Sequence, residues 1–471
     1  MEDVKNSNFQ HAQAVPTKRF FVSMLTRDIS LEDAILDLLD NCLDGALRVS
    51  EQEVNYSKFS VEINLKKDHF SIQDNCGGIP KQVAANYAFK MGREPDDTRD
   101  QDSETIGMYG VGMKRAIFKM GRNACVSTNF ESDRYKVDIT SVWLEEKEWT
   151  PLPILDLEQP ETLSSPGTLI QIFDLYPGVA KQFENSAFVN DLNKAIGEHF
   201  ATFIKKGLTV VLNGSKINPV NVEVLSSSDS NGPAPYVYQK DIDGVQVSIV
   251  VGLNTGRKFD EDEVDFVRDR SSSTAGWTVF CNDRAVIVGD KTRLTGWGDG
   301  VPMYHGQFSV ITGIVEFKST SADKLPVTTT KRALDTSSDI WLEARSKMRE
   351  GLRIWINYTN HWKNNPRSDQ SSHWESSKPV SLNEAIETIK ARKVVTKSDG
   401  AIEYNPNKKK VLPKPPESKP SSRKVVFTRA QEEIKTVSLH FFDSEDQSPG
   451  IVGDKCFEYV LRKISKNVQE S

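Results

Sequence analysis

The stretch SLEDAILDLLDNCLDGALR (30–48) combines an amphipathic helix pattern with an unusual concentration of acidic residues. Ser30 and Asp33 form a capping signal, and the apolar positions predict one buried stripe, made of Ile35, Leu38, Leu39, Cys42, Leu43 and Ala46. The opposite face carries Asp33, Asp37, Asp40, Asn41 and Asp44, and the first basic residue of the stretch is Arg48. Because like charges at this spacing repel, the face indicates either a cation-binding or catalytic site or an ordinary solvated acidic surface. Asp37 and Asn41, at i and i+4, would then point into one cavity.

Two strand-like segments follow this helix and end in a glycine turn. Alternating apolar residues in KFSVEINL (58–65) and HFSIQDNCGGIP (69–80) predict two strands, the second of which closes on Asp74 and a Gly-Gly turn. An aspartate at a strand end beside glycines can hold a ligand amine, because the missing side chains let that ligand approach the backbone. The same residues are also typical of a plain turn.

The stretch ETIGMYGVGMKRAIFKMG (104–121) places Gly107, Gly110 and Gly112 just before an amphipathic helix. Backbone N–H groups at the positive end of that helix suit a phosphate chain, and Lys114 adds a cation. The spacing matches neither a P-loop nor a Rossmann fingerprint, and Arg115 stands where a Walker motif needs Ser or Thr. The alternative is a glycine-rich loop used only for close helix packing. Upstream, the polar run 93–104 predicts a mobile lid over a nucleotide.

Composition and charge exclude several classes of protein. The 471 residues have a formal charge of −6 and are 37% hydrophobic and 27% charged, which is typical of a soluble globular chain. No apolar run approaches the length needed to span a bilayer, and MEDVKNSNFQ lacks the apolar core of a signal peptide, so we expect a cytoplasmic protein without membrane contact. Five scattered cysteines favour free thiols over disulfides or a zinc site.

The chain is predicted to be α/β, as an α+β sandwich, with four parts. A first domain over 18–178 ends in SSPGTLIQIFDL (164–175), where Thr168 could hydrogen-bond a buried base or a water molecule. A second domain over 190–360 carries β-rich segments and a last helix from about Ser337. Residues 364–425, rich in Lys, Pro and Ser, predict a flexible linker with one short helix capped by Ser381. Residues 426–471 predict a small α+β module, in which VSLHFF (437–442) alternates like a strand.

Taken in order, the four motifs of the first domain resemble the GHKL ATPases, which include gyrase B subunits, heat-shock chaperones, MutL and sensor histidine kinases. The resemblance implies a Bergerat-type ATP-binding domain, with Asp37 as the general base and Asn41 as the Mg²⁺ ligand. It also implies that Asp74 takes the adenine amino group, with support from Gly78 and Thr168. The phosphates would be wrapped by the glycine-rich segment, through Gly107, Tyr109, Gly110, Val111, Gly112, Met113 and Lys114. Two departures stand out: the usual base is Glu, one methylene longer than Asp37, and Cys76 replaces the first glycine of the DxGxG pattern.

The second domain narrows this resemblance. LPVTTTKRALD (325–335) looks like the loop of a ribosomal-S5-like transducer domain that brings a lysine to the γ-phosphate, which here is Lys331. Together with GWTVFCNDRAVI (276–287), the glycine-rich motif resembles MORC-type proteins, including prokaryotic ones. The resemblance implies an ATP-driven clamp or conformational switch that forms a homodimer with ATP, has a DNA or protein partner, and acts in DNA-related or anti-phage defence processes. The alternatives are a heat-shock-type chaperone and a nucleotide-gated scaffold that does not hydrolyse ATP.

Overall fold

The computed structural model describes residues 17–50, 54–92, 104–105, 107, 110–157, 163, 165–229, 232–254, 274–328, 331–363, 374, 376–392, 400–415, 425 and 428–469. The chain divides into two compact units, Met1–Pro415 and Pro416–Ser471, which are described separately below. In the described part of the chain, none of the helices is both long and apolar enough to cross a membrane.

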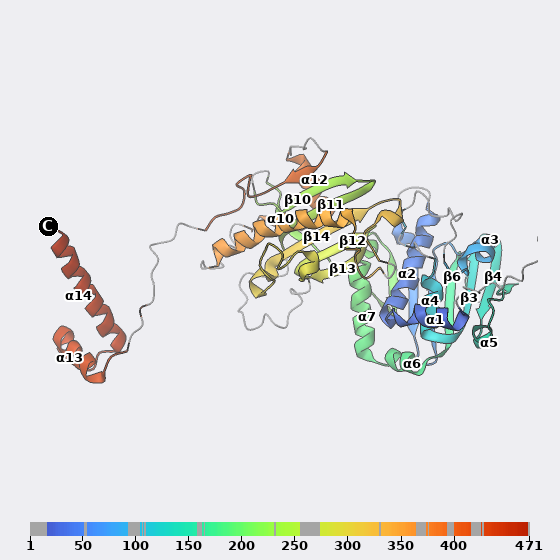
Figure 1. Cartoon of the computed structure of the whole chain (residues 1–471), viewed down its shortest axis with the longest axis horizontal. Coiled ribbons are helices and arrows are strands. Elements are labelled where there is room, and N and C mark those ends of the chain that lie inside the picture. The colour runs from blue at the N-terminus through green and yellow to red at the C-terminus, as the bar shows by residue number, and fades with distance from the viewer. Residues whose placement is uncertain are drawn as a thin grey trace, which may run out of the picture. The chain divides into compact units, whose positions relative to one another are not determined.

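An eight-stranded sheet forms the framework of the N-terminal part of the first unit (Figure 1). Its order is β5-β4-β3-β6-β2-β1-β7-β8, and neighbouring strands are antiparallel except for the parallel pair β1 and β7. The strands are β1 (Ser60–Leu65), β2 (His69–Asp74), β3 (Gly121–Phe130), β4 (Asp133–Ile139), β5 (Ile154–Asp156), β6 (Gly167–Leu175), β7 (Thr209–Leu212) and β8 (Ser215–Lys216). Buried residues alternate with more exposed ones along β1 and β2, so one face of the sheet packs on a core.

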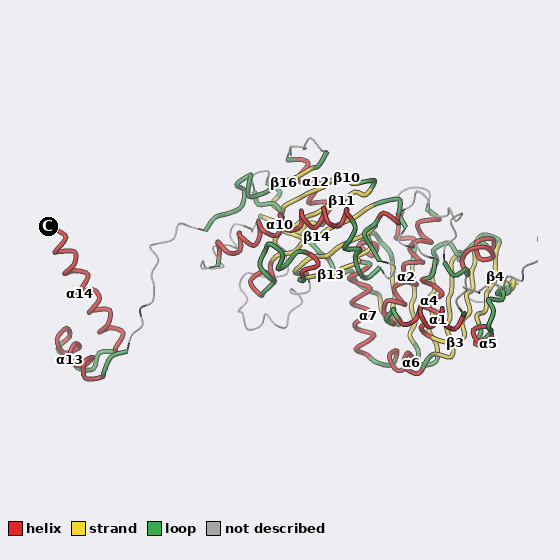
Figure 2. Tube along the Cα trace, in the orientation of Figure 1, coloured by secondary structure: helices red, strands yellow, loops and turns green. Residues whose placement is uncertain are grey.

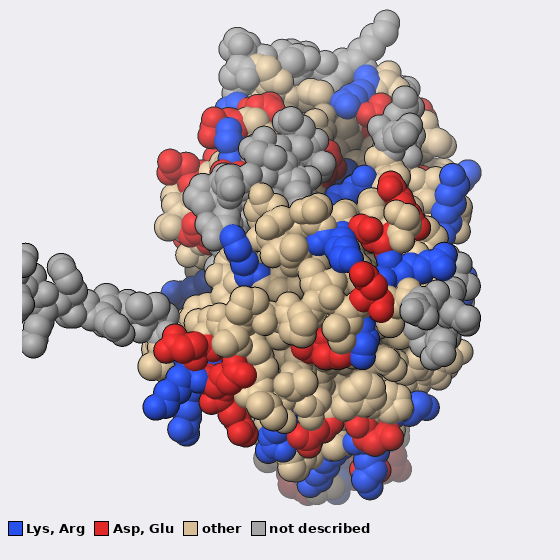
Figure 3. All heavy atoms as spheres, turned by 90° about the vertical axis from the view of Figure 1, so that its right-hand side faces the viewer, with Lys and Arg blue, Asp and Glu red and all other residues tan. Residues whose placement is uncertain are grey.

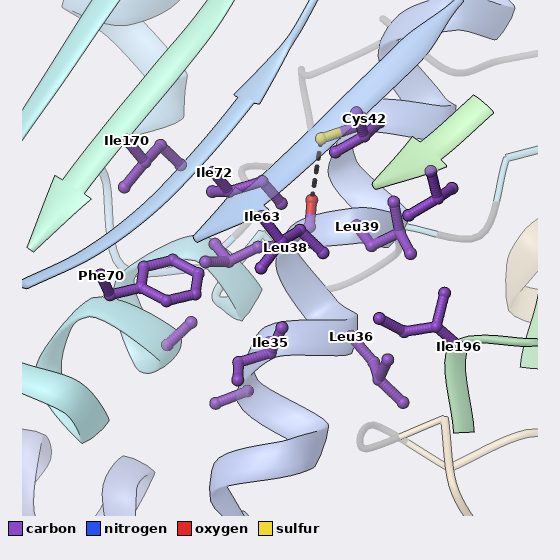
Figure 4. Close-up of a cluster of buried hydrophobic side chains, with 14 of the residues drawn as sticks. Ile35, Leu36, Leu38, Leu39, Cys42, Ile63, Phe70, Ile72, Ile170 and Ile196 are labelled. Carbon is purple, nitrogen blue, oxygen red and sulfur yellow. Dashed lines mark hydrogen bonds between the residues drawn. The ribbon is translucent and has the colours of Figure 1, made fainter. Parts of the chain in front are cut away.

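Helices cover that buried face and share one hydrophobic core with it. They are α1 (Lys18–Arg27), α2 (Leu31–Arg48), α4 (Gly112–Met120), α5 (Ser141–Glu145), α6 (Pro177–Phe183), α7 (Ser186–His199) and α8 (Ala201–Lys205), whereas the short helix α3 (Lys81–Val83) follows β2 and has no buried residue. The Ser30 hydroxyl caps α2 by accepting a hydrogen bond from the Asp33 N–H at 3.0 Å. Figure 4 shows Ile35, Leu38 and Leu39 of α2 among side chains of the sheet. The predicted helix and its buried stripe are therefore confirmed.

A six-stranded sheet with the order β13-β12-β14-β11-β10-β16 follows in the same unit. Its strands are β10 (Tyr236–Ile242), β11 (Val245–Leu253), β12 (Gly276–Cys281), β13 (Arg284–Asp290), β14 (Ile311–Lys318) and β16 (Ile402–Tyr404). Helix α10 (Asp339–Trp362) packs on one face and α12 (Leu382–Ala391) packs on the other, so β11 is buried on both sides. A two-stranded ribbon of β9 (Val224–Ser227) and β15 (Ser377–Val380) completes this part.

The mixed α/β class is confirmed, but some predicted boundaries need correction. The first sheet extends beyond residue 178, because β7 pairs with β1 and therefore lies in the range predicted for the second domain. Much of the predicted linker 364–425 is folded, since β15, α12 and β16 pair with or pack on the second sheet. The short helix within it is confirmed, including the capping box of Ser381 and Glu384.

The second unit contains two helices in its described residues, α13 (Gln431–Phe442) and α14 (Pro449–Gln469), as Figure 2 shows. The predicted strand 437–442 is wrong, because these residues form the end of α13. A six-residue alternation also fits a helix, on which Ile434, Val437 and Phe441 share one side. The Glu433 carboxylate accepts the Ala430 N–H at 3.2 Å, which stabilises the start of this helix. The predicted α+β module is therefore helical in the part that the structure describes.

Candidate functional site

One cavity of about 480 Å³ collects the predicted site residues from separate segments of the chain. This volume lies in the range of small-molecule binding sites. Its walls include Asp37, Asn41, Asp74, Gly78, Gly107, Gly110, Val111, Gly112, Met113, Lys114, Thr168 and Lys331. Tyr109 and residues 93–103 of the lid predicted over 93–104 lie outside the described residues. The structure thus brings together every predicted site residue that it describes.

Asp74 forms the polar end of the cavity at the last residue of β2. Its Oδ1 atom accepts hydrogen bonds from the Cys76 N–H at 2.7 Å and the Thr168 N–H at 3.3 Å. Cys76 thus contributes its backbone N–H to this contact. Burial raises the pKa of Asp74 to about 6. The carboxyl can therefore present an acceptor to a ligand amine when it is ionised.

The turn after Asp74 requires glycine at position 78. Gly78 has a φ of +76°, and a Cβ atom there would lie 2.3 Å from the carbonyl oxygen of Asn129. The next residue is fixed as well, because the Ile79 N–H donates to the Thr128 hydroxyl at 2.8 Å. The hydroxyl of Thr128 in turn donates to the Gly167 carbonyl at 3.2 Å. Backbone can therefore approach a ligand closely here, while β3 and β6 hold the turn in place.

The acidic face of α2 is buried, so the alternative of a solvated surface is wrong for Asp37, Asp40 and Asp44, which are 3%, 0% and 1% exposed. The Asp37 carboxylate forms an ion pair with Arg115 of α4. Asp44 accepts the Gly107 N–H at 2.9 Å, which ties the start of the glycine-rich segment to α2. Burial raises the pKa of Asp37, against the opposing charges of Lys331 and Arg115. A carboxyl with a raised pKa is a stronger base than an ordinary aspartate.

The glycine-rich segment leads into the N-terminus of α4 beside Asp37. Gly110 has a φ of 65°, and Gly112 is the first residue of α4. Both line the cavity, so the first N–H groups of α4 lie at its wall. The Lys114 ammonium is buried and donates to the carbonyl of Ala88 at 2.9 Å and to that of Gly110. In this structure Lys114 therefore closes the segment onto residue 88 while also lining the cavity.

Lys331 reaches the cavity from the second sheet's side of the unit. Its ammonium lies 3.0 Å from Asp40 Oδ2, and Arg284 of β13 contacts Asp40 Oδ1 at 2.9 Å. The neighbouring Arg332 forms ion pairs with Glu32 and Asp33 at the start of α2. Ion pairs of Arg284, Lys331 and Arg332 thus link the region that contains the six-stranded sheet to α2.

A family model described as "Histidine kinase-, DNA gyrase B-, and HSP90-like ATPase" matches residues 29–166 of the chain. The match supports the GHKL superfamily. It covers α2, the turn after β2 and the glycine-rich segment, which are the elements that form most of the cavity wall. No curated protein matches the chain.

The cavity offers a suitable but incomplete ligand set for Mg²⁺ among the described residues. Asn41 is exposed on α2 and lines the cavity, whereas Asp37, Asp40 and Asp44 are engaged with cations or backbone N–H groups. Among the described residues, no group of three or more His, Cys, Asp or Glu side chains is arranged to hold a metal ion. Mg²⁺ commonly binds one or two protein oxygens together with substrate phosphates and water, so the Asn41 amide oxygen fits this role.

Sequence reasoning missed the partners of the acidic residues in this GHKL-type domain. In the sequence, Arg115 stands out only as a mismatch to a Walker motif. In the structure, its guanidinium forms an ion pair with Asp37. Arg284, 244 positions after Asp40, had no signal in spacing or motif. The absence of a basic residue near the α2 carboxylates was the available clue, because four acids on one helix face need cations from elsewhere if they are buried.

Proposed function

We propose that the protein is a Mg²⁺-dependent ATPase that works as an ATP-driven dimerising clamp or conformational switch. The observation that carries this proposal is the single cavity in which Asn41, Asp74, Gly110 and Lys331 meet from four separate segments. The match of residues 29–166 to GHKL-type ATPases supports ATP-dependent activity independently of that geometry.

In the proposed mechanism, Asp74 and Thr168 bind the adenine end and the N-terminus of α4 binds the phosphates. Asp37 accepts a proton from the attacking water, and its burial and raised pKa support this role. Bound through Asn41, Mg²⁺ would neutralise phosphate charge. Lys331 contacts the γ-phosphate and stabilises the charge that develops there. Since Lys331 belongs to the loop before α10, its position couples the second domain to the nucleotide state.

Exposed apolar side chains on the GHKL-type domain support the dimerisation part of the proposal. Phe20 and Met24 of α1 are 60% and 43% exposed, and Val142 of α5 is 71% exposed. Helix α1 contacts α5, so these side chains belong to neighbouring elements. Figure 3 views the end of the first unit and shows a broad area of uncharged side chains between charged ones. Such a surface suits a second copy of the chain.

The MORC-like part of the proposal, with a role in DNA-related or anti-phage defence, is supported by the sequence resemblance around the glycine-rich motif and Lys331. Its test is DNA-stimulated turnover, which a heat-shock-type chaperone would not show. Stimulation by denatured protein in place of DNA would favour the chaperone.

Steady-state phosphate release tests the proposal that the protein hydrolyses ATP. We expect Asp37→Asn to lower kcat by about 10²-fold or more, because it removes the base while keeping the side-chain shape. Binding of a fluorescent ATP analogue should remain, which separates lost chemistry from lost structure. Asp68→Asn, an exposed position in the β1–β2 loop, is the matched control and should turn over as the unaltered chain does. Analogue binding without turnover in the unaltered protein would overturn hydrolysis in favour of a nucleotide-gated scaffold.

A further inference from the structure

Asp40 lies at the centre of α2 and is completely buried. The proposed mechanism of ATP hydrolysis assigns no role to this residue. Both of its carboxylate oxygens are occupied by cations. Arg284 Nε contacts Oδ1 at 2.9 Å, and Lys331 Nζ contacts Oδ2 at 3.0 Å. Burial alone would raise the pKa of Asp40, but these two charges lower it below its usual range. Asp40 is therefore an ionised carboxylate shared by two residues that follow it by more than 200 positions.

The two cations differ in how firmly they are held. Arg284 is 1% exposed, donates to the Ala285 carbonyl at 2.7 Å, and contacts His199 Nδ1 at 3.0 Å. Its guanidinium also stacks on the Phe200 ring, 4.6 Å from the centroid. Arg284 would thus keep its place without Lys331, so it can act as a permanent counter-ion for Asp40.

Lys331 instead stands at a strained position on the cavity wall. Its φ is 55°, in the left-handed region, which is unfavourable for a residue with a side chain. Its N–H donates to the Thr328 carbonyl at 2.9 Å within a loop closed by the bridge between Val327 and Leu334. A strained residue persists only where its surroundings hold it, and the ion pair with Asp40 supplies such a restraint.

We propose that Asp40 is a positioning residue that holds Lys331 when no triphosphate is bound and competes with the γ-phosphate for its ammonium. This inference rests on the proposed function, because it assumes that Lys331 contacts the γ-phosphate. When the triphosphate binds, the Lys331 ammonium leaves Asp40 and contacts the γ-phosphate. When the γ-phosphate is lost, the ammonium returns to Asp40. Asp40 thereby lowers the affinity for the triphosphate and favours opening after hydrolysis.

Arg284 makes this exchange energetically possible. Leaving a buried carboxylate without a partner is strongly destabilising, so a lysine that was its sole counter-ion could not depart easily. When Lys331 leaves, Asp40 still has the ion pair with Arg284. Lys331 in turn exchanges one anion for another. The pair of cations on Asp40 therefore divides into one structural partner and one that can move.

The experiment removes the competitor while keeping the buried charges balanced. In the double variant Asp40→Asn/Arg284→Gln, both buried charges disappear and Lys331 loses its resting partner. Dissociation constants are measured for a non-hydrolysable ATP analogue and for ADP, using the full chain with Mg²⁺. If Lys331 rests on Asp40 in about nine-tenths of nucleotide-free molecules, the triphosphate should bind about tenfold more tightly. ADP affinity should change less than twofold, because ADP has no γ-phosphate.

Two controls separate this effect from general ones. In a Lys331→Met background the same double substitution should leave triphosphate affinity unchanged, as a double-mutant cycle requires. The variant Asp299→Asn/Arg349→Gln removes an ion pair in the second domain, in which the nitrogen and oxygen atoms are 3.0 Å apart. Neither residue lines the cavity, so the affinity for both ligands should stay unchanged. Asp40→Asn alone, which leaves Arg284 in place, provides the same comparison if the double variant does not fold.

Each outcome decides the proposal. A gain in affinity that is selective for the triphosphate and depends on Lys331 supports the proposal. Equally weaker binding of both ligands would show that Asp40 is only structural. A gain in triphosphate affinity that persists without Lys331 would show a general effect of the two substitutions. Either result overturns the proposal. If the unaltered chain binds neither ligand, the proposed function itself fails. If it binds and hydrolyses ATP but the variants show no selective gain, only the inference about Asp40 fails.

Discussion

Replacing Arg115 by glutamine should change the pH dependence of hydrolysis. The Arg115 and Asp37 side chains are 7% and 3% exposed, so solvent screens their ion pair very little. An opposite charge in contact lowers a carboxyl pKa by about 1–3 units. Burial raises the pKa of Asp37, while Lys331 and Arg115 oppose that rise. Because Arg115 is one of the two cations that oppose the rise, and Lys331 remains in the Arg115→Gln variant, we expect the pKa of Asp37 to increase further in that variant.

The assay is kcat measured from pH 5 to pH 9 with saturating ATP. Activity is lost on the acidic side as Asp37 becomes protonated, so the midpoint of that loss should move to higher pH in the variant. Arg115→Lys should restore most of the original profile. Lys119→Gln is the control, because Lys119 lies one turn further along α4 and donates to the Thr26 carbonyl at 2.9 Å. An unchanged acidic midpoint in a folded Arg115→Gln variant would refute the role of Arg115 as the charge that keeps Asp37 ionised.

Two further predictions concern the part of the cavity that is proposed to bind adenine. Gly78→Ala should lower the free energy of unfolding in urea by more than the roughly 1–2 kcal/mol of left-handed backbone strain, because the new Cβ would lie 2.3 Å from the Asn129 carbonyl oxygen. Gly214→Ala, with a φ of +80° and no neighbour within 4 Å, isolates that strain, and equal losses at both positions would contradict the close approach. ADP affinity should fall as the pH drops through about 6, since protonation of Asp74 replaces an acceptor by a donor. Titrations from pH 5 to pH 8 check this, and an Asp74→Asn variant that keeps the same pH dependence would exclude Asp74 as its source.

The local elements of the first domain could be predicted because the sequence carries their signals within a few residues. The helix after Ser30 has a cap and a 3.6-residue apolar period, the strand that ends at Asp74 alternates, and the strand that begins at Gly167 is rich in apolar residues. The glycines at 77 and 78 mark a turn, and both have positive φ. The confirmed elements are thus those in which hydrophobic period and turn chemistry agree.

The folding of residues 377–392 and 400–404 could not be predicted from composition. This segment lies in a range rich in Lys, Pro and Ser, but its contacts are made at few positions. Tyr404 is 4% exposed in β16, which has only three residues and pairs with β10. Such a short edge strand derives its stability from a sheet that is distant in sequence, and an average over 60 residues conceals it.

The cations that pair with the carboxylates of α2 could not be predicted for a related reason. In the proposed mechanism these cations control the site. A buried carboxylate specifies that a cation must be near but not where it lies in the sequence. Arg115 comes from the GHKL-type domain, whereas Arg284 and Lys331 come from the second domain. Asp37 therefore responds to α4 through Arg115, and Asp40 responds to the second domain through Arg284 and Lys331. Because both carboxylates lie on one helix, a nucleotide that draws Lys331 away from Asp40 also removes a positive charge from beside Asp37. Movement of the second domain and the basicity of the proposed catalytic base are then coupled through α2, without any change in the fold of either domain.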